Sequence, residues 1–272
     1  MAEIPHEYLE LIQDVRNSKK YRDLDLPEDF LLDILNHEAG RGMSGKALKD
    51  KFRTQLHNVI APYLETLDYA QEIDIWLNFQ QTNPSLSELR TWAAGVLSKH
   101  ASSRERLPHL SLLYQKIEDQ IGIPESIMDL ACALDPLNLL WTDWPKTIPY
   151  FAYDLNLPRV KFLNRFFPAV YPNAKAIQQD ILINPPTEPT QAAFFFKEAH
   201  RFEKRKPGSN AYFFMSLPVD VIIVTLPATD LTGHHSLENY HGQLIQSAIQ
   251  NHPWQLVEDR AGDELIFFIF KR

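Results

Sequence analysis

Residues 126–136 read Ser-Ile-Met-Asp-Leu-Ala-Cys-Ala-Leu-Asp-Pro, a short apolar run that ends in small residues and an acid. Such a run is typical of the first strand of a doubly wound sheet, in which a nucleotide-like ligand lies close to the backbone of the turn after the strand. The small side chains of Ala131, Cys132 and Ala133 permit that approach. Because the stretch contains no G-x-G-x-x-G pattern, an ordinary tight β–α turn is an alternative interpretation.

Further short β-prone runs follow and alternate with segments of helical pattern, such as 159–167 and 237–250. Strands that alternate with helices predict βαβ units and a mostly parallel sheet, and the run nearest the C-terminus predicts an antiparallel terminal hairpin. The expected strands are 127–131, 150–153, 176–177, 193–196, 221–226 and 265–270.

The N-terminal part of the chain has a different periodicity. From residue 8 to about residue 121 the apolar residues recur at helical spacing, which predicts a set of helices. Pro27 is expected inside the first turn of one of these helices, and Ser85 is expected to cap another. We therefore predict an α/β protein with an all-helical N-terminal domain at residues 1–105 and an open-sheet domain at residues 106–272.

Carboxylates follow three successive expected strands. Asp135 comes after the first, Asp154 follows 19 residues later at the end of the second, and Asp180 ends the third. The carboxyl ends of parallel strands line one edge of the sheet, where ligands bind in open α/β folds. A carboxylate at that edge can accept hydrogen bonds from two ribose hydroxyls. The three acids therefore predict a site for an adenosine-type ligand.

Basic side chains lie just before the expected sheet, in His100-Ala-Ser-Ser-Arg104-Glu-Arg106. At helical spacing these three residues come close to one another, and a guanidinium can hold a carboxylate with two parallel hydrogen bonds. The segment is a candidate for binding a ligand carboxylate. A solvated helix with a capping residue is the alternative interpretation.

The composition argues against several classes of protein. Among its 272 residues the chain has 27 Lys and Arg against 35 Asp and Glu, and its net charge of −8 is unlike that of a generally basic nucleic-acid binder. The single cysteine, Cys132, excludes an internal disulfide and a cysteine-based zinc site. The N-terminus has no signal-peptide pattern, and no apolar run approaches the length of a membrane span. We expect a cytoplasmic protein with neither a membrane partner nor a bound metal.

Several segments resemble one family over nearly the whole chain. The segment from His100 to Leu107, continued at Leu112-Leu-Tyr114, resembles the segment before the sheet in the aminoglycoside-resistance methyltransferases of the Arm/Rmt type, which are 16S rRNA (guanine(1405)-N(7))-methyltransferases. The segment from Asp129 to Leu137 resembles their motif I. Further matches are Ser18–Tyr21, Gly40-Arg41, Arg53–His57, Phe194–Lys197, Phe202-Glu203 and Asp263–Ile266.

The resemblance implies a Rossmann-like domain that binds S-adenosylmethionine, preceded by a helical domain that docks on the 30S ribosomal subunit. His100 and Arg106 are thereby expected to meet the methionine carboxylate, and Asp154 to hold the ribose. The loop after the first strand is expected to pass beneath the methionine part. The full set of implied cofactor contacts, from the carboxylate through the adenine to the mouth of the site, is His100, Arg106, Ala131, Ala133, Asp135, Asp154, Gln179, Asp180 and Lys197.

The same resemblance makes 16S rRNA the expected substrate. Guanine N7 carries a lone pair and no proton, so its methylation needs no general base, and no catalytic side chain is expected beyond those that position the reactants. Basic residues of the helical part are expected to contact rRNA phosphates, with an ordinary charged helical surface as the alternative. They are Lys19, Lys20, Arg22, Arg41, Lys46, Lys49 and Arg53. Nothing indicates an obligate oligomer, so a monomer is expected.

Three departures from the family pattern leave other functions open. Ala133 replaces the glycine of motif I, Asp135 replaces an asparagine, and the loop at 227–240 has Thr229 and His234 where the family has arginines. Alanine suits the motif I turn if the backbone there does not require a positive φ. One alternative is a methyltransferase of the same fold that acts on another RNA or on a small molecule. Another is a non-catalytic binding protein that keeps the fold.

Overall fold

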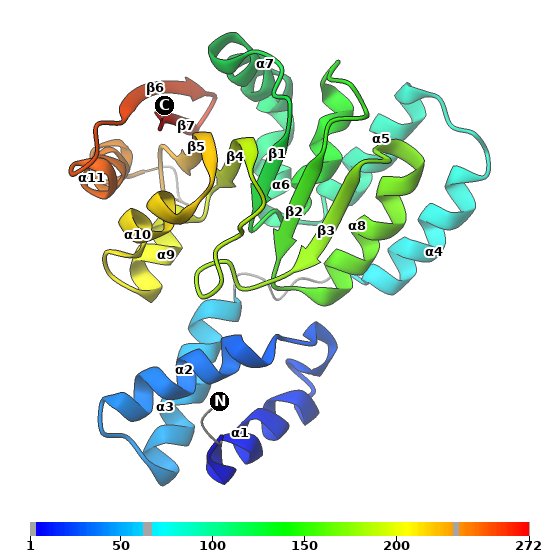
Figure 1. The fold of residues 1–272 in the computed structure, drawn as a ribbon. Coiled ribbons are helices and arrows are strands. Elements are labelled where there is room, and N and C mark those ends of the chain that lie inside the picture. Colours follow the sequence, from blue (N-terminus) through cyan, green and yellow to red (C-terminus); the bar gives the residue numbers. More distant parts are fainter. Residues whose placement is uncertain (1–3, 62–66, 231–233, 272) are drawn as a thin grey trace.

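The computed structural model describes residues 4–61, 67–230 and 234–271. In these residues a seven-stranded sheet is covered by helices on both faces, and three N-terminal helices lie below it in the view of Figure 1. No helix among the described residues is long and apolar enough to cross a membrane.

The N-terminal group consists of α1 (His6–Asn17), α2 (Glu28–Gly40) and α3 (Gly45–Ile60), with the short 3-10 helix η1 (Arg22–Leu24) between α1 and α2. Each of the three helices buries one apolar face, and these faces form a separate hydrophobic cluster. Pro27 is the N-cap of α2 and has an extended ψ of 142°, so it lies just before the first turn rather than inside it as predicted.

The next four helices pack against the sheet. They are α4 (Tyr69–Gln80), α5 (Leu86–Leu97), α6 (Ala101–Arg106) and α7 (Leu110–Ile121), with the 3-10 helix η3 (Leu107–His109) before α7. Ser85 caps α5 as predicted, in a reciprocal capping box with Glu88. Trp76 of α4 and Leu113 of α7 belong to the same hydrophobic cluster as Phe194 of the sheet.

The two hydrophobic clusters divide the chain between Ile60 and Leu67. The sequence predicted the boundary at residue 105 because all helices before the sheet share one periodicity, which does not reveal the partner against which a helix packs. We propose instead a boundary between α3 and α4, which assigns α4 to α7 to the sheet domain.

The sheet has the strand order β3-β2-β1-β4-β5-β7-β6. Its first five strands pair in parallel, whereas β7 runs antiparallel to both β5 and β6. The predicted mostly parallel sheet and its antiparallel terminal hairpin are therefore confirmed. The strands are β1 (Ile127–Leu130), β2 (Tyr150–Asp154), β3 (Ala174–Gln178), β4 (Thr190–Phe196), β5 (Val219–Pro227), β6 (Gln255–Ala261) and β7 (Glu264–Phe270).

The remaining helices complete the two covering layers (Figure 1). Phe162 and Phe166 of α8 join α4, α5 and α7 on one face, while Phe202, Phe213 and Ile245 place α9, α10 and α11 on the other. The bounds of these elements are η4 (Asp135–Trp141, a 3-10 helix), α8 (Leu157–Val170), α9 (Ala199–Arg205), α10 (Ser209–Ser216) and α11 (Glu238–Ile249).

An arginine whose side chain is 12% exposed joins the N-terminal helices to the sheet domain. Arg205 of α9 pairs with Asp33 of α2 at 3.0 Å and with Asp180, which follows β3, at 2.7 Å. Its guanidinium also lies over the ring of Phe30 in α2, 5.1 Å from the centroid. Through these contacts Arg205 holds α2 opposite the carboxyl end of β3.

Candidate functional site

The loop after β1 lies where the strand order reverses, because β1 has β2 on one side and β4 on the other. Ligands of open α/β sheets bind at such a point. Ala131 and Ala133 have φ values of 54° and 48°, in the left-handed region that favours glycine. The motif I turn therefore does require a positive φ at Ala133, contrary to the condition under which alanine would suit it. The turn leads into the 3-10 helix η4, not directly into an α-helix.

We expect Ala133→Gly to raise the free energy of unfolding by up to about 1 kcal/mol, because a left-handed conformation costs a residue with a Cβ about 1–2 kcal/mol and glycine's greater unfolded-state freedom offsets part of the gain. Urea unfolding measures the difference. Ala47→Gly, at an exposed position of α3, is the matched control and should destabilise by about 1 kcal/mol. A clear loss of stability in Ala133→Gly would contradict the strain assigned to this turn.

Asp154, at the end of β2, fastens this loop. Its Oδ2 accepts a hydrogen bond from the backbone N–H of Ala133 at 3.0 Å and pairs with Arg159 of α8 at 2.6 Å. Its Oδ1 accepts from the backbone N–H of Asn156 at 2.8 Å. Only 3% of Asp154 is exposed. The predicted ribose acid is therefore also a structural element of the turn.

A cavity of about 900 Å³ opens beside this acid. Its wall on the sheet side includes four of the predicted cofactor residues, Ala131, Asp154, Gln179 and Asp180. Gln179 donates from Nε2 to the carbonyl of Asn184 at 2.5 Å, and its backbone N–H donates to the carbonyl of Asp154 at 3.0 Å. The opposite walls come from α2, α3, α9 and α10. The structure thus brings the predicted nucleoside half of the site together and encloses it with helices.

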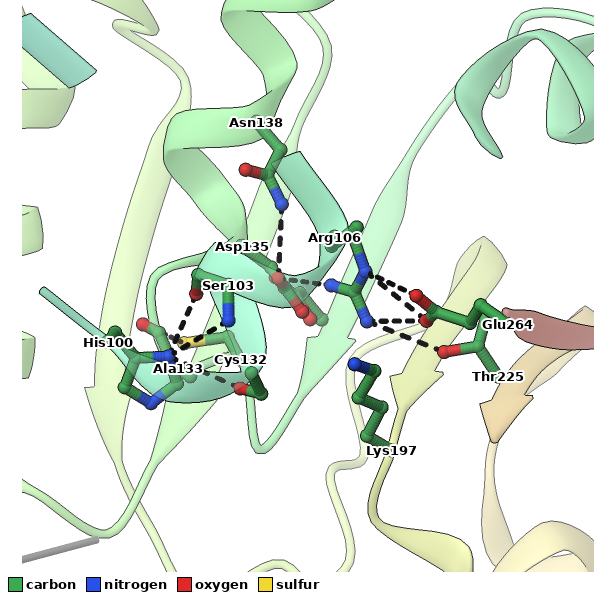
Figure 2. Close-up of polar contacts among 12 residues, drawn as sticks. His100, Ser103, Arg106, Cys132, Ala133, Asp135, Asn138, Lys197, Thr225 and Glu264 are labelled. Atoms are coloured by element: carbon green, nitrogen blue, oxygen red, sulfur yellow. Dashed lines mark hydrogen bonds and ion pairs between the residues drawn. The ribbon is translucent and has the colours of Figure 1, made fainter. Parts of the chain in front are cut away.

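The other predicted cofactor residues surround Arg106, next to the same loop (Figure 2). The guanidinium is 4% exposed and binds two carboxylates, Asp135 at 2.5 Å and Glu264 of β7 at 2.7 Å. It also lies over the ring of Phe196, 4.8 Å from the centroid. Arg106 is therefore held by acids of the protein itself, whereas the sequence predicted a guanidinium available to a ligand carboxylate.

The two acids differ in how this pairing affects them. Burial raises the pKa of Asp135, and the nearby charge of Arg106 offsets only part of that effect. Burial also raises the pKa of Glu264, but the charge of Arg106 and its hydrogen bonds outweigh burial and hold that pKa below its ordinary value. Arg106, Asp135 and Glu264 form a group that we call the Arg106 cluster. Its two carboxylates and one guanidinium leave one negative charge in excess, and Lys197 lies beside it (Figure 2).

His100 and Lys197 flank the Arg106 cluster. His100 is the N-cap of α6, and its Nδ1 accepts from the backbone N–H of Ser103 at 3.4 Å. The capping role that the sequence offered as an alternative is therefore present. The ring that caps the helix is buried, at 6% exposure, and not solvated. Because Nδ1 is an acceptor, the neutral ring carries its proton on Nε2. Lys197, with a φ of 59°, pairs through Nζ with Glu105 at 2.9 Å.

Asp129 in β1 is a buried acid that the sequence reasoning did not single out, although an acid inside an apolar strand was an available signal. Its Oδ2 accepts from the hydroxyl of Tyr150 at 2.5 Å, and its Oδ1 has no hydrogen-bond partner among the described residues. Burial, together with the charge of Asp135, raises the pKa of Asp129 well above its ordinary value.

This shift gives stability a defined pH dependence. The folded pKa of Asp129 exceeds its unfolded value near 3.8, so the folded state keeps a proton that the unfolded state has lost, and stability falls as pH rises through this window. We expect Asp129→Asn, which is neutral throughout, to keep or raise stability at neutral pH and to remove this slope. Urea unfolding between about pH 5 and 8 tests it, and a variant much less stable than wild type at neutral pH contradicts the assignment.

The basic residues predicted to contact RNA lie on the surface of the N-terminal helices. Lys49 and Arg53 both pair with Asp14, at 2.8 and 3.4 Å, and Lys20 contacts His57 at 2.9 Å. Exposed ion pairs contribute only about 0–1 kcal/mol, so these pairings leave the cations able to bind phosphate. Lys49 is half-buried, and the exposed members of the set are Lys19, Lys20, Arg22, Arg41, Lys46 and Arg53.

The loop after β5, where the sequence departs from the family pattern, is held by hydrogen bonds within the loop and to the turn between β6 and β7. Thr229 donates to Asp263 at 2.6 Å, and Asp230 accepts from the backbone N–H of His234 at 3.1 Å. The part of this loop at residues 231–233 lies outside the described residues. Within the described part of the chain no group of three or more side chains is suited to hold a metal ion.

A doubly wound sheet with a cavity at its switch point, lined by an acid at the end of the second strand, is the architecture of proteins that bind nucleotide-like cofactors. A family model described as ribosomal RNA methyltransferase (FmrO) matches residues 17–268, so the chain belongs to this family of methyltransferases. The family predicted from the sequence is thereby confirmed.

Similar proteins agree with this assignment. The chain is 29% identical over 264 residues to a 16S rRNA (guanine(1405)-N(7))-methyltransferase of Serratia marcescens, with 93% of this chain and 94% of the relative covered. It is 29% identical over 179 residues to an enzyme of the same name from Micromonospora echinospora, of which it covers 65%, just under two thirds.

Two solved structures share the fold. The 16S rRNA methylase RmtB is 25% identical with a TM-score of 0.76, over 99% of this chain and 100% of that chain. The 16S rRNA methyltransferase RmtF, solved in complex with S-adenosyl-L-homocysteine, is 21% identical with a TM-score of 0.81 over the same shares. The predicted Rossmann-like methyltransferase fold with N-terminal helices is confirmed.

Proposed function

We propose that the protein is an S-adenosylmethionine-dependent methyltransferase that modifies N7 of a guanine in 16S rRNA, the reaction that the names of its relatives state for those proteins. The observation that carries the proposal is the cavity at the switch point, whose wall combines Ala131, Asp154, Gln179 and Asp180. The proposed partner is the 30S subunit, so the protein is expected to act in the cytoplasm, and we propose that it acts as a monomer.

The nucleoside half of S-adenosylmethionine suits this wall. A carboxylate offers about four lone-pair sites, and Asp154 uses three of them within the protein, so it can still accept a ribose hydroxyl. Asp180 is committed to Arg205 at 2.7 Å and to the backbone N–H of Leu182 at 3.0 Å. Asp180 therefore fixes the shape of the wall, and Gln179 is the better candidate for contact with the adenine.

The charges of the Arg106 cluster suit the methionine half of the cofactor. The roles of the residues, however, differ from those expected from the sequence. The excess negative charge on Asp135 and Glu264 suits the α-ammonium group, while Lys197 and the Nε2–H of His100 suit the carboxylate. Arg106 then acts as a positioning residue that joins η4 to β7. A direct contact of Arg106 with the ligand carboxylate would compete with the two acids that already pair with its guanidinium.

The reaction requires little of the side chains except that they position the reactants. When bound, the cofactor supplies an electrophilic methyl group on its sulfonium sulfur. Guanine N7 presents a lone pair without a proton, so no residue of the site has to accept one. The residues of the cavity hold the reactants in line and exclude water, and such positioning can supply about 7–11 kcal/mol of the barrier reduction.

RNA binding is proposed for the basic residues of α1, η1, α2 and α3. Their phosphate contacts fix register without reading bases. The loop after β5 favours a second candidate, a methyltransferase of the same fold with another acceptor, because Asp230 and Glu238 bring negative charge where RNA would approach. We also propose that methylation of 16S rRNA by this protein raises the aminoglycoside concentration that inhibits a host expressing it.

The test is transfer of labelled methyl groups to three acceptors: 30S subunits, 50S subunits and protein-free 16S rRNA. The proposal predicts incorporation into 30S subunits well above the other two. Incorporation into none of the three, with calorimetry showing that S-adenosylmethionine binds, would instead support the candidate with another acceptor. Absence of both binding and incorporation would leave a non-catalytic protein as the correct interpretation.

A further inference from the structure

The cavity extends well beyond its nucleoside wall. Its volume of about 900 Å³ is near the upper end of the range of about 300–1,000 Å³ for pockets that hold one drug-sized ligand. On the side formed by α9 and α10 it is lined by His200, Ser209 and Tyr212. This second part has room for a planar group beside the proposed cofactor.

One face of α10 points two different groups at the cavity. Ser209 and Tyr212 are three residues apart, so they lie on the same face of the helix, and both line the cavity. Tyr212 is 60% exposed, which places its ring at the opening, whereas Ser209 is 5% exposed and lies deeper. An exposed aromatic ring at the mouth of a cavity is a stacking surface for an unpaired base.

Two buried polar atoms beside this ring have no hydrogen-bond partner among the described residues. They are Oγ of Ser209 and Nδ1 of His200. A buried polar atom left unpaired costs about 1–3 kcal/mol, so a ligand that pairs with both recovers that free energy on binding. Burial and the charge of Arg201 lower the pKa of His200 to about 4, so its ring is neutral near pH 7 and has one nitrogen that accepts.

The charge around this part of the cavity suits a nucleic acid. Lys204 and Lys206 of the α9 end line the same cavity and are exposed. Their ammonium groups can neutralise the phosphates on either side of a base that enters the cavity.

We propose that Tyr212, Ser209 and His200 form a subsite for a guanine base of the RNA substrate, with the base stacked on the Tyr212 ring. The inference rests on the proposed function. The Watson–Crick edge of guanine offers the N1–H donor for the accepting nitrogen of His200 and the O6 acceptor for the Ser209 hydroxyl. Held by that edge, the base leaves N7, which lies on the adjacent Hoogsteen edge, without a protein partner. The subsite therefore selects guanine and presents the atom that is methylated.

The test compares Tyr212→Ala with Tyr240→Ala in the full-length protein, with 30S subunits as acceptor. Tyr240 is 56% exposed on α11 and does not line the cavity, so it is a matched control. Loss of base stacking should lower kcat/KM of Tyr212→Ala by roughly 10- to 100-fold, while Tyr212→Phe, which keeps the ring, and Tyr240→Ala stay close to wild type. Calorimetry should find the affinity for S-adenosylmethionine unchanged in all three.

Ser209→Ala supplies a second readout. Removal of an unpaired buried hydroxyl should leave the melting temperature unchanged or raised, yet lower kcat/KM by about 5- to 10-fold because a hydrogen bond to the base is lost. The subsite is refuted if Tyr212→Ala is as active as Tyr240→Ala, or if its cofactor affinity falls in parallel with its activity. No methyl transfer by the wild type to any RNA refutes the proposed function, and the subsite with it.

Discussion

Arg106→Met is expected to destabilise the protein by about 3–5 kcal/mol, because it leaves buried carboxylates without their counter-ion. Asp135 and Glu264 are both under 10% exposed and both pair with this guanidinium. Equilibrium unfolding in urea at pH 7 measures the loss. Arg104→Met, at an exposed position two residues earlier, is the matched control and should change stability little.

Two further measurements separate lost charge from lost packing. The triple variant Arg106→Met, Asp135→Asn, Glu264→Gln removes the whole cluster of charges and should recover a large part of the stability. Lowering the pH should reduce the difference in the free energy of unfolding between the wild type and Arg106→Met. Because the pKa of Glu264 is lowered in the folded wild type, this group stabilises the protein at pH values above its ordinary pKa, and that stabilisation is lost as the pH falls. The variant has no such contribution to lose. A gap that is independent of pH contradicts the ion-pair explanation.

Asp154→Asn is expected to weaken binding of S-adenosylmethionine by about 100-fold, since hydrogen bonds to a charged group contribute about 1.5–3 kcal/mol each. The amide also presents N–H to partners that donate, namely the backbone of Ala133 and the guanidinium of Arg159. Isothermal titration calorimetry, at a temperature well below the melting transition of the variant, measures the change.

Arg159→Met distinguishes binding from stability. Arg159 is fully buried and pairs with Asp154, so its removal should destabilise the protein by about 3–5 kcal/mol. The Asp154 carboxylate remains in this variant, so cofactor affinity should fall far less than in Asp154→Asn. Equal losses of affinity in the two variants, or an Asp154→Asn protein that binds like wild type, would show that Asp154 does not hold the cofactor.

Local patterns were enough to predict the sheet. Alternation of apolar runs with helical segments predicted β1 to β5, β7 and the helices at 157–170 and 238–249 within a few residues. It also predicted a terminal hairpin, but without bounds for β6. Ser85 was identified as a cap because the residues of a capping box lie within four consecutive positions of the sequence. Each of these features depends on neighbours in the sequence, which a single chain displays directly.

Features that depend on distant partners could not be predicted. Arg106 pairs with Glu264 across 158 positions, and only the closure of β7 against β5 brings the two together. The positive φ of Ala133 follows from the turn between β1 and η4, and alanine gives no sign of it. The residues of α9 and α10 that line the cavity were missed because a tyrosine and a serine at helical spacing equally suit an ordinary surface helix.

The position of the transferred methyl group shows directly whether the protein modifies N7 of a guanine in 16S rRNA. Wild-type protein is incubated with 30S subunits and S-adenosylmethionine, the 16S rRNA is extracted, and the strand is cleaved chemically at N7-methylguanine and read by primer extension. We expect one new cleavage, at the guanine 1405 named for the relatives. Incorporation of methyl groups without any new cleavage at a guanine of 16S rRNA would contradict the proposed function.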